Sequence, residues 1–180
     1  SDIKWSHFYT VKNSDIELLS MERRAGCREI AYGVESGSDR ILKLLNKNQT
    51  IGDVKKAFKS CNTANIKATA LFMLGLPSET EEDLKATKSL ITSLKTYQDI
   101  ATIYRPYPKT PLYESLNFKE PLTLEEQADF YDYGELGENV TNVSKVATKE
   151  LLRWQKYFYR RTLLKELYFS IRDCNCQRLR

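Results

Sequence analysis

Residues 29–45 read EIAYGVESGSDRILKLL, and this stretch decides the fold class. A mostly apolar run over 29–34 predicts a buried strand, small residues over 35–38 predict a turn, and apolar spacing over 41–45 predicts a helix. The same order recurs at 67–94, and further strands are expected over 5–11 and 100–104. The strand centres, near residues 7, 32, 71 and 102, lie 25, 39 and 31 residues apart. These are the lengths of β-α-β crossovers, so the sequence predicts an α/β fold with a parallel sheet.

Capping residues mark where the helices should begin. We expect an N-cap at Ser14 or Asp15, and capping boxes that pair Thr50 with Asp53. Two more capping boxes are predicted, one that pairs Ser78 with Glu81 and one that pairs Thr123 with Glu126. The second would begin a helix that ends near residue 136.

The region after residue 105 differs in character. Prolines at 106, 108 and 111 predict an irregular connection that continues to residue 121. A long amphipathic helix follows, and its stripe of apolar and aromatic side chains is expected to pack on the sheet or on other helices. The stripe consists of Leu151, Trp154, Phe158, Leu164, Tyr168 and Ile171.

Composition narrows the class of protein. The chain has 180 residues, of which 41% are hydrophobic and 29% charged, and this amino-acid composition is typical of a globular protein. The longest nearly apolar run, 68–76, is far shorter than the roughly 20 residues that cross a bilayer, so no membrane span is expected. Four cysteines without a C-x-x-C pair indicate a reducing, cytoplasmic setting. His7 is the only histidine, which excludes multi-histidine zinc sites, and we assign no metal ligand.

Charge is segregated near the C-terminus. Residues 114–138 hold eight carboxylates and one lysine, net −7, whereas residues 149–180 hold nine basic and three acidic residues, net +6. The basic region could attract a nucleic acid or an acidic partner. A solvated helix face beside its acidic neighbour is the favoured interpretation, and we do not expect a nucleic acid partner.

Two turns carry the candidate site, because ligands of parallel α/β folds bind at the carboxyl ends of the strands. In the turn 33–38, Glu35 could accept hydrogen bonds from a ribose diol or an ammonium group. The turn 75–80 would place the Gly75 backbone near a ligand and leave amides free at a helix N-terminus. Spacing alone leaves open the alternative that Glu35 and Glu79 are helix-start carboxylates favoured by the dipole.

Three segments carry a resemblance to a known family. They are AGCREIAYGVESGS at 25–38, FMLGLPSETEED at 72–83 and PYPKTPLY at 106–113, with single matches at Ile41, Leu42, Lys47 and Thr50. Together they resemble the radical S-adenosylmethionine enzyme domain. The similarity is strongest to the branch with a cobalamin-binding module and to the methylthiotransferases. It implies an incomplete (β/α) TIM-like barrel over 1–115, comprising the last four strands of a six-stranded partial barrel. Residues 116–180 would be an α-helical extension.

The resemblance also implies roles for single residues. Glu35 and Ser36 would contact the ribose and methionine portions of S-adenosylmethionine. Met73 would lie near the adenine, and the backbone of Gly75, Leu76 and Pro77 would line the adenine pocket. Arg105 is a candidate substrate contact, and Glu79 is expected to shape its turn.

One family feature is missing from the sequence. Radical S-adenosylmethionine enzymes hold a [4Fe-4S] cluster on a C-x-x-x-C-x-x-C loop, which this chain lacks, and the Cys174-Asn-Cys176 spacing does not replace it. We therefore expect the C-terminal portion of a longer enzyme, catalytically silent alone. Its parent would use S-adenosylmethionine and the cluster to make a 5′-deoxyadenosyl radical, or would use cobalamin as well to transfer a methyl group. Its expected partners are the N-terminal half of the barrel and, through the exposed sheet edge, a second copy.

Two other functions stay open. The first is a cluster-free α/β binding module whose basic C-terminal helix recruits RNA or a protein. The second is an unrelated phosphate-binding enzyme that uses the Gly75 turn, although G-x-G-x-x-G and P-loop motifs are missing from the sequence.

Overall fold

The computed structural model describes residues 3–107, 109–116 and 142–178, with side chains up to residue 171. The strands are β1 (Trp5–Tyr9), β2 (Cys27–Glu35), β3 (Lys67–Leu74) and β4 (Gln98–Ile103). The helices are η1 (Val11–Asn13), α1 (Ile16–Arg24), α2 (Asp39–Leu44), α3 (Ile51–Thr63), α4 (Glu81–Ser93), α5 (Pro111–Ser115) and α7 (Thr148–Arg178).

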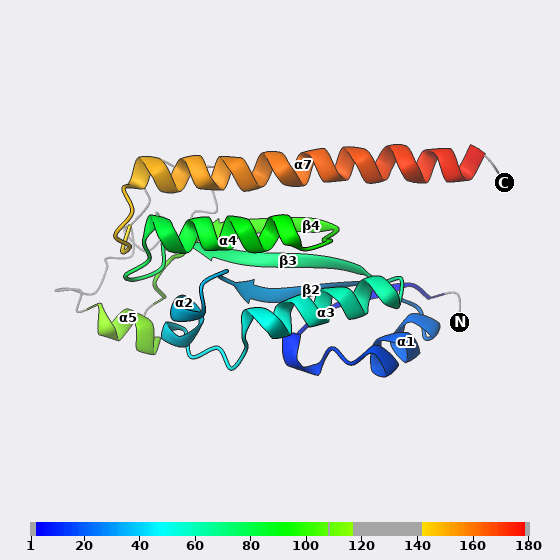
Figure 1. The fold of residues 1–180 in the computed structure, drawn as a ribbon, viewed down its shortest axis with the longest axis horizontal. Coiled ribbons are helices and arrows are strands. Elements are labelled where there is room, and N and C mark those ends of the chain that lie inside the picture. Colours follow the sequence, from blue (N-terminus) through cyan, green and yellow to red (C-terminus); the bar gives the residue numbers. More distant parts are fainter. Residues whose placement is uncertain (1–2, 108, 117–141, 179–180) are drawn as a thin grey trace.

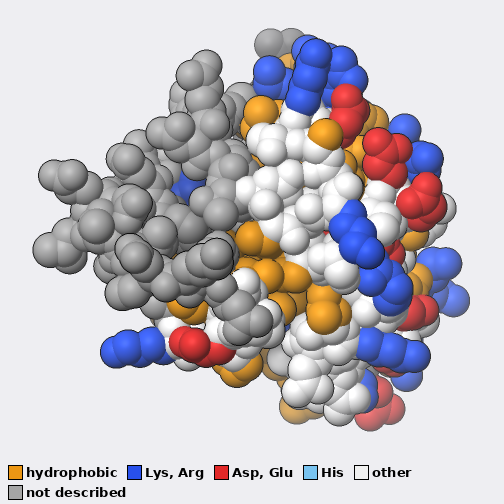
Figure 2. Space-filling model, turned by 90° about the vertical axis from the view of Figure 1, so that its left-hand side faces the viewer, with side chains coloured by type: hydrophobic (Ala, Val, Ile, Leu, Met, Phe, Trp, Pro, Cys, Tyr) orange, Lys and Arg blue, Asp and Glu red, His pale blue; other side chains and the backbone are white. Residues whose placement is uncertain are grey.

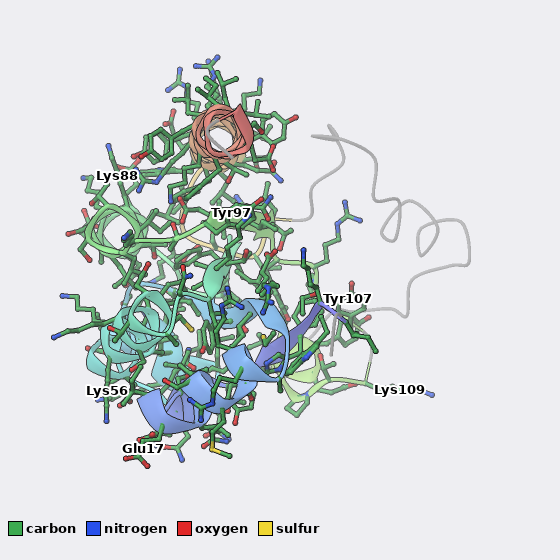
Figure 3. All side chains as sticks on the ribbon, turned by 90° about the vertical axis from the view of Figure 1, so that its right-hand side faces the viewer. Glu17, Lys56, Lys88, Tyr97, Tyr107 and Lys109 are labelled. Atoms are coloured by element: carbon green, nitrogen blue, oxygen red, sulfur yellow. The ribbon has the colours of Figure 1, made fainter. Side chains whose placement is uncertain are left out.

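The four strands form one parallel sheet in the order β1-β2-β3-β4. Every strand therefore pairs with its successor in the chain, and the crossover helices lie on the same face (Figure 1). In the end-on view, Lys56 of α3 and Lys88 of α4 lie on one side of the sheet, and Tyr107 and Lys109 lie on the other (Figure 3). This arrangement confirms the predicted α/β class and is that of an incomplete (β/α) barrel.

Local sequence signals account for most element boundaries. Thr50 and Asp53 form the predicted capping box, and the side chain of Asp15 caps α1 by accepting from the amide of Glu17. The prediction for α4 was wrong, because its capping box joins Thr80 to Asp83 rather than Ser78 to Glu81. Ser78 has a φ of 60°, so the chain is still turning there and cannot begin a helix.

The proline-rich connection is also more regular than predicted. Helix α5 begins at Pro111, with Thr110 as its N-cap accepting from the amide of Tyr113. Proline is compatible with the first helical position because the N–H it lacks would have no helical partner there. The predicted helix from Thr123 to residue 136 lies outside the described residues.

The hydrophobic core fills the space between the sheet and the helices. Its largest fully buried side chains include Leu19, Ile30, Tyr32, Phe58 and Phe72. Helix α7 contributes Leu151 and Phe158 to the same core, and the Phe158 ring stacks on Phe72 with centroids 6.4 Å apart. The division of the chain near residue 115 into barrel and extension stays a prediction.

Only the first half of the α7 stripe packs as predicted. Leu151 and Phe158 are fully buried, whereas Leu164 is 69% exposed, Tyr168 62% and Ile171 55%. The reason is length, because 31 helical residues extend about 46 Å and the six residues of β4 about 20 Å. The helix runs beyond the strand it covers (Figure 1).

A buried carboxylate ties α7 to β4. Asp99 accepts from Nε of Arg161 at 2.8 Å and from Nζ of Lys165 at 2.6 Å, and its carboxylate is fully buried. The hydroxyl of Thr162 contacts both the amide and the carbonyl of Asp99, so α7 satisfies the backbone groups of this residue on the outer edge of β4. Two cations of the basic helix therefore neutralise Asp99 instead of facing solvent, which weakens the case for an RNA-binding helix.

Within the described residues, no helix is long and apolar enough to cross a membrane. Cys27 and Cys61 are both buried and unpaired by disulfides.

The two halves of α7 should respond differently to truncation. We expect Phe158→Ala to lower the free energy of unfolding by about 3–5 kcal/mol, because a buried aromatic ring leaves a cavity. Leu164→Ala on the same helix should change it by about 0.5 kcal/mol or less, because the side chain is exposed. Urea denaturation followed by circular dichroism measures both, and equal losses would contradict this packing of α7.

Candidate functional site

The carboxyl end of β2 carries the first part of the site. Ile30, Tyr32 and Val34 point into the helix-covered core, so the alternate residues, Gly33 among them, face the helix-free side of the sheet. Glu35 has a φ of 66°, and the register with β3 shifts between Gly33 and Glu35. This bulge re-aims the Glu35 side chain.

The carboxylate of Glu35 folds back over Gly33. A Cβ atom at residue 33 would lie 2.6 Å from Glu35 Oε1 and 3.5 Å from Lys47 Nζ. A side chain at residue 33 would therefore displace the ion pair between these two groups, whose N–O distance is 2.7 Å. Among the described residues no group binds the second carboxylate oxygen of Glu35, which can accept a hydrogen bond from a ligand.

The loop after α2 holds Lys47 in this position. The side-chain amide of Gln49 donates to the carbonyls of Gly33 and Val34, both at 3.1 Å, and fastens the loop to the end of β2. Beside the ion pair lies a cavity of about 350 Å³. Its walls are formed by Tyr9, Thr10, Lys12, Asn13, Gly33, Lys47, Asn48 and Gln49. The cavity opens at the carboxyl ends of β1 and β2, where parallel folds bind ligands.

The second turn is closed by its own carboxylate. Oε2 of Glu79 accepts from the amides of Gly75 at 2.6 Å and Leu76 at 3.2 Å. The expectation of free amides in this turn was wrong, which also removes the basis for a phosphate site there. Glu79 is fully buried, and its Oε1 has no hydrogen-bond partner in the structure. Burial raises the pKa of its carboxyl group to about 7.

Helix α4 joins the two turns. Asp83 accepts from the hydroxyl of Ser38 at 2.6 Å and from the amide of Thr80 at 2.9 Å, and it pairs with Arg40. Burial alone would raise the pKa of Asp83. Hydrogen bonds from Arg40, Ser38 and Thr80 outweigh burial and lower this pKa to about 2. The carboxylate stays ionised and holds the turns in fixed relation.

Ser36 lies inside this junction. Its side chain is fully buried, 3.3 Å from the hydroxyl of Thr87, and the amide of Gly37 donates to Thr87 at 2.9 Å. The hydroxyl of Ser36 also accepts from the amide of Ser38 at 3.2 Å. The structure thus directs Ser36 toward α4, where it positions the turn that carries Glu35.

The remaining candidates are divided between the two faces. Met73 is half-buried and alternates with the buried Phe72 and Leu74, so it shares the helix-free face with Gly33. Gly75 instead faces α7, because a Cβ there would lie 3.0 Å from Leu151. Leu76 and Pro77 are buried, and Arg105 is half-buried just after β4. These residues and the ion pair of Glu35 with Lys47 lie at the carboxyl end of the sheet. Figure 2 views the molecule from this end and shows hydrophobic side chains near its centre.

Two residues of the site were assigned no role in it from the sequence. The helix pattern placed Thr87 on the packing side and did not single out Asp83, and the structure buries both against the turn 36–38. The available signal was their position on the same side of α4 as the apolar Leu84 and Ile91.

The sequence of this chain is similar to that of known proteins. The family model described as "Radical SAM superfamily" matches residues 4–91. Anaerobic magnesium-protoporphyrin IX monomethyl ester cyclase of Cereibacter sphaeroides is 30% identical over 158 residues, covering 86% of this chain and 24% of that protein. A tRNA-2-methylthio-N(6)-dimethylallyladenosine synthase of Aeromonas hydrophila is 36% identical over 80 residues, covering 43% and 17%.

Solved structures share the fold. The radical S-adenosylmethionine methyltransferase TsrM of Kitasatospora setae, solved with cobalamin and a [4Fe-4S] cluster, aligns with a TM-score of 0.58 at 19% identity. The alignment covers 63% of this chain and 23% of TsrM. Coproporphyrinogen III oxidase HemN of Escherichia coli aligns at 0.58 and 15% identity, covering 72% and 30%.

Fold and site together define a segment of a (β/α) barrel with a carboxylate at the carboxyl end of its second strand. Residues 4–91, just under half of this chain, match the radical SAM superfamily. The chain spans about a quarter or less of the length of the two relatives named above.

The buried carboxyl group of Glu79 should make stability depend on pH. Its pKa rises from 4.5 to about 7 on folding, so the folded state binds more protons between these values and loses stability as pH rises through that window. We expect a loss of about 3 kcal/mol between pH 4.5 and pH 7 from this group.

Glu79→Gln should remove most of that slope, because the amide oxygen still accepts from Gly75 and Leu76 but carries no charge. Urea midpoints at a series of pH values measure the effect. Glu81→Gln removes a carboxylate from an exposed position in the first turn of α4 and corrects for the change in net charge. A slope that is unchanged in Glu79→Gln would show that the group is not buried as described.

Proposed function

We propose that this chain forms part of the S-adenosylmethionine and substrate wall of a radical S-adenosylmethionine enzyme. The observation that carries the proposal is the Glu35 carboxylate at the carboxyl end of β2. It stands over Gly33 on the helix-free face, with one oxygen on Lys47 and the other available. In a barrel this face lines the interior, where the cofactor would lie.

The residues fit the polar part of the cofactor. A carboxylate is a suitable acceptor for the ammonium group of the methionine portion or for the ribose hydroxyls, and Lys47 can bind a carboxylate. Met73 on the same face offers an apolar contact for the adenine. Ser36 would act indirectly, by fixing the turn through Thr87. Gly75, Leu76 and Pro77 would contribute backbone carbonyls, since two of their amides bind Glu79.

The chemistry would come from the whole enzyme. When bound to a [4Fe-4S] cluster, S-adenosylmethionine supplies a 5′-deoxyadenosyl radical, or a methyl group where cobalamin assists. The sequence given has no C-x-x-x-C-x-x-C loop, so the cluster ligands would belong to another part of the parent protein. On this proposal the chain alone is catalytically silent, Arg105 contacts substrate, and the parent uses cobalamin, the group that TsrM binds in its solved structure.

The edge strand β1 is the proposed junction with the rest of the barrel. Within the described residues β1 pairs on one side only, with β2, and Phe8 on this strand is 79% exposed. The N-terminal half of the barrel would pair there, and in its absence a second copy would compete for the same edge. We place the protein in the cytoplasm, where the free thiols Cys27 and Cys61 stay reduced.

Binding of S-adenosylmethionine tests the role of Glu35. We expect the cofactor to shift amide resonances of residues 33–36 and 47 in a nitrogen-15-labelled chain. Glu35→Gln should weaken this binding about tenfold, because a charge-assisted hydrogen bond becomes a neutral one. Glu29→Gln is the matched control, since Glu29 lies on the same face of β2 but binds Thr69 at 2.7 Å. No shifts at millimolar cofactor, or equal weakening in both variants, would refute the assignment.

Reconstitution tests the absence of a cluster site. Anaerobic treatment of the chain with iron and sulfide should produce no stoichiometric [4Fe-4S] absorption band, because the chain's four cysteines lack the spacing that places three thiolates on one cluster. A stoichiometric band would overturn the view that the chain supplies only a wall of the site.

A further inference from the structure

At the amino-terminal side of the sheet, three side chains of different elements converge. His7 belongs to β1, Glu22 to α1 and Cys27 to the start of β2. One ligand atom from each lies within 4.8 Å of the other two. This cluster takes no part in the site proposed above, which lies at the carboxyl ends of the strands.

The distances suit a tetrahedral ion. Nε2 of His7 and Oε2 of Glu22 are 3.3 Å apart. Two ligand atoms bound to Zn²⁺ at about 2.05 Å with a tetrahedral angle are themselves separated by about 3.3 Å. The sulfur of Cys27 needs a separation of about 3.5 Å from each and lies within 4.8 Å of both, so ion binding would draw the three side chains together.

The imidazole of His7 provides a second, independent observation. Its Nδ1 lies 3.2 Å from the carbonyl oxygen of Phe8, and its Nε2 faces the Glu22 carboxylate. A protonated imidazole would donate to both oxygen atoms, whereas a neutral one can donate to only one of them. With Nδ1 donating to the backbone, the lone pair of Nε2 points toward Glu22, which is the orientation of a metal-binding histidine.

Neighbouring aromatic side chains restrict the orientation of the His7 imidazole. Trp5 and Tyr9 flank the imidazole, with ring centroids 5.3 Å and 5.1 Å away. The side chain of His7 is 25% exposed and that of Glu22 is 17% exposed, which gives an ion access from solvent, whereas Cys27 is fully buried. Metal-binding histidines commonly have their second nitrogen fixed by a backbone carbonyl in this way.

We propose that His7, Glu22 and Cys27 form a binding site for a divalent zinc-type cation that clamps β1 and α1 to β2, with water as the fourth ligand. The nitrogen, oxygen and sulfur donor set favours Zn²⁺ over the oxygen-seeking Mg²⁺ and Ca²⁺. On binding, the S–H bond of Cys27 breaks, its proton passes to solvent and the sulfur bonds to the metal; no electron is transferred. The ion would hold the edge strand β1 in place.

Cobalt substitution tests the site with the full chain. The background is Cys174→Ser with Cys176→Ser, so that only Cys27 and Cys61 remain as thiols. Added Co²⁺ should produce a thiolate-to-cobalt charge-transfer band with visible bands of tetrahedral intensity, and Zn²⁺ should abolish both. Because the chain has a single histidine, stoichiometric Zn²⁺ should also shift its one set of imidazole resonances.

Matched variants separate this site from alternatives. Cys27→Ser should remove the charge-transfer band, and Cys61→Ala, which changes the other buried thiol, should retain it. His7→Gln and Glu22→Gln, at partly exposed positions, should each weaken Co²⁺ binding at least about tenfold, even if Cys27→Ser fails to fold. No cobalt band, a band that survives His7→Gln unchanged, or a band lost in Cys61→Ala would overturn the proposal and leave a simple His7–Glu22 pair.

Discussion

The constraint on which the structure depends is that every crossover returns to the same face of the sheet. Parallel strands require long connections, and here each connection leads to the adjacent strand, so α1, α3 and α4 all cover one side. The other side is left with the small and polar residues of β2, including Glu29, Gly33 and Glu35. A doubly wound sheet would have covered this face with helices as well.

The sequence predicted those parts of the fold that are encoded locally. β3 occurs over Lys67–Leu74 as expected, because a run of apolar residues ended by glycine has few alternatives. The capping box of Thr50 and Asp53 needs only four residues to form. The start of α4 was misplaced because Ser78 and Thr80 both offer a hydroxyl three residues before an acid, and only the φ of Ser78 excludes the first.

The sequence proposed residues for the site and could not show their contacts. The resemblance pointed to Glu35 and Ser36, but the burial of Ser36 against Thr87 joins residues 51 positions apart, which no local pattern encodes. The same applies to the cluster of His7, Glu22 and Cys27, since their spacing matches no metal-binding motif and only the packing of α1 on β1 and β2 assembles it. The net charge of α7 likewise overstated the positive charge that this helix presents to solvent. Arg161 and Lys165 are balanced by Asp99, which lies on a strand distant in the sequence.

The hydroxyl of Thr162, set between the amide and carbonyl of Asp99, has a consequence for assembly. It occupies the outward-facing backbone groups of that one residue, and α7 runs alongside β4, so a neighbouring strand would have to displace the helix there. Within the described residues β1 pairs only with β2, so its outer edge is the one that a second copy could reach. Edge-to-edge filaments need two open edges on every subunit. Two copies that met through β1 would use up both open edges, and the pair would close as a two-fold dimer.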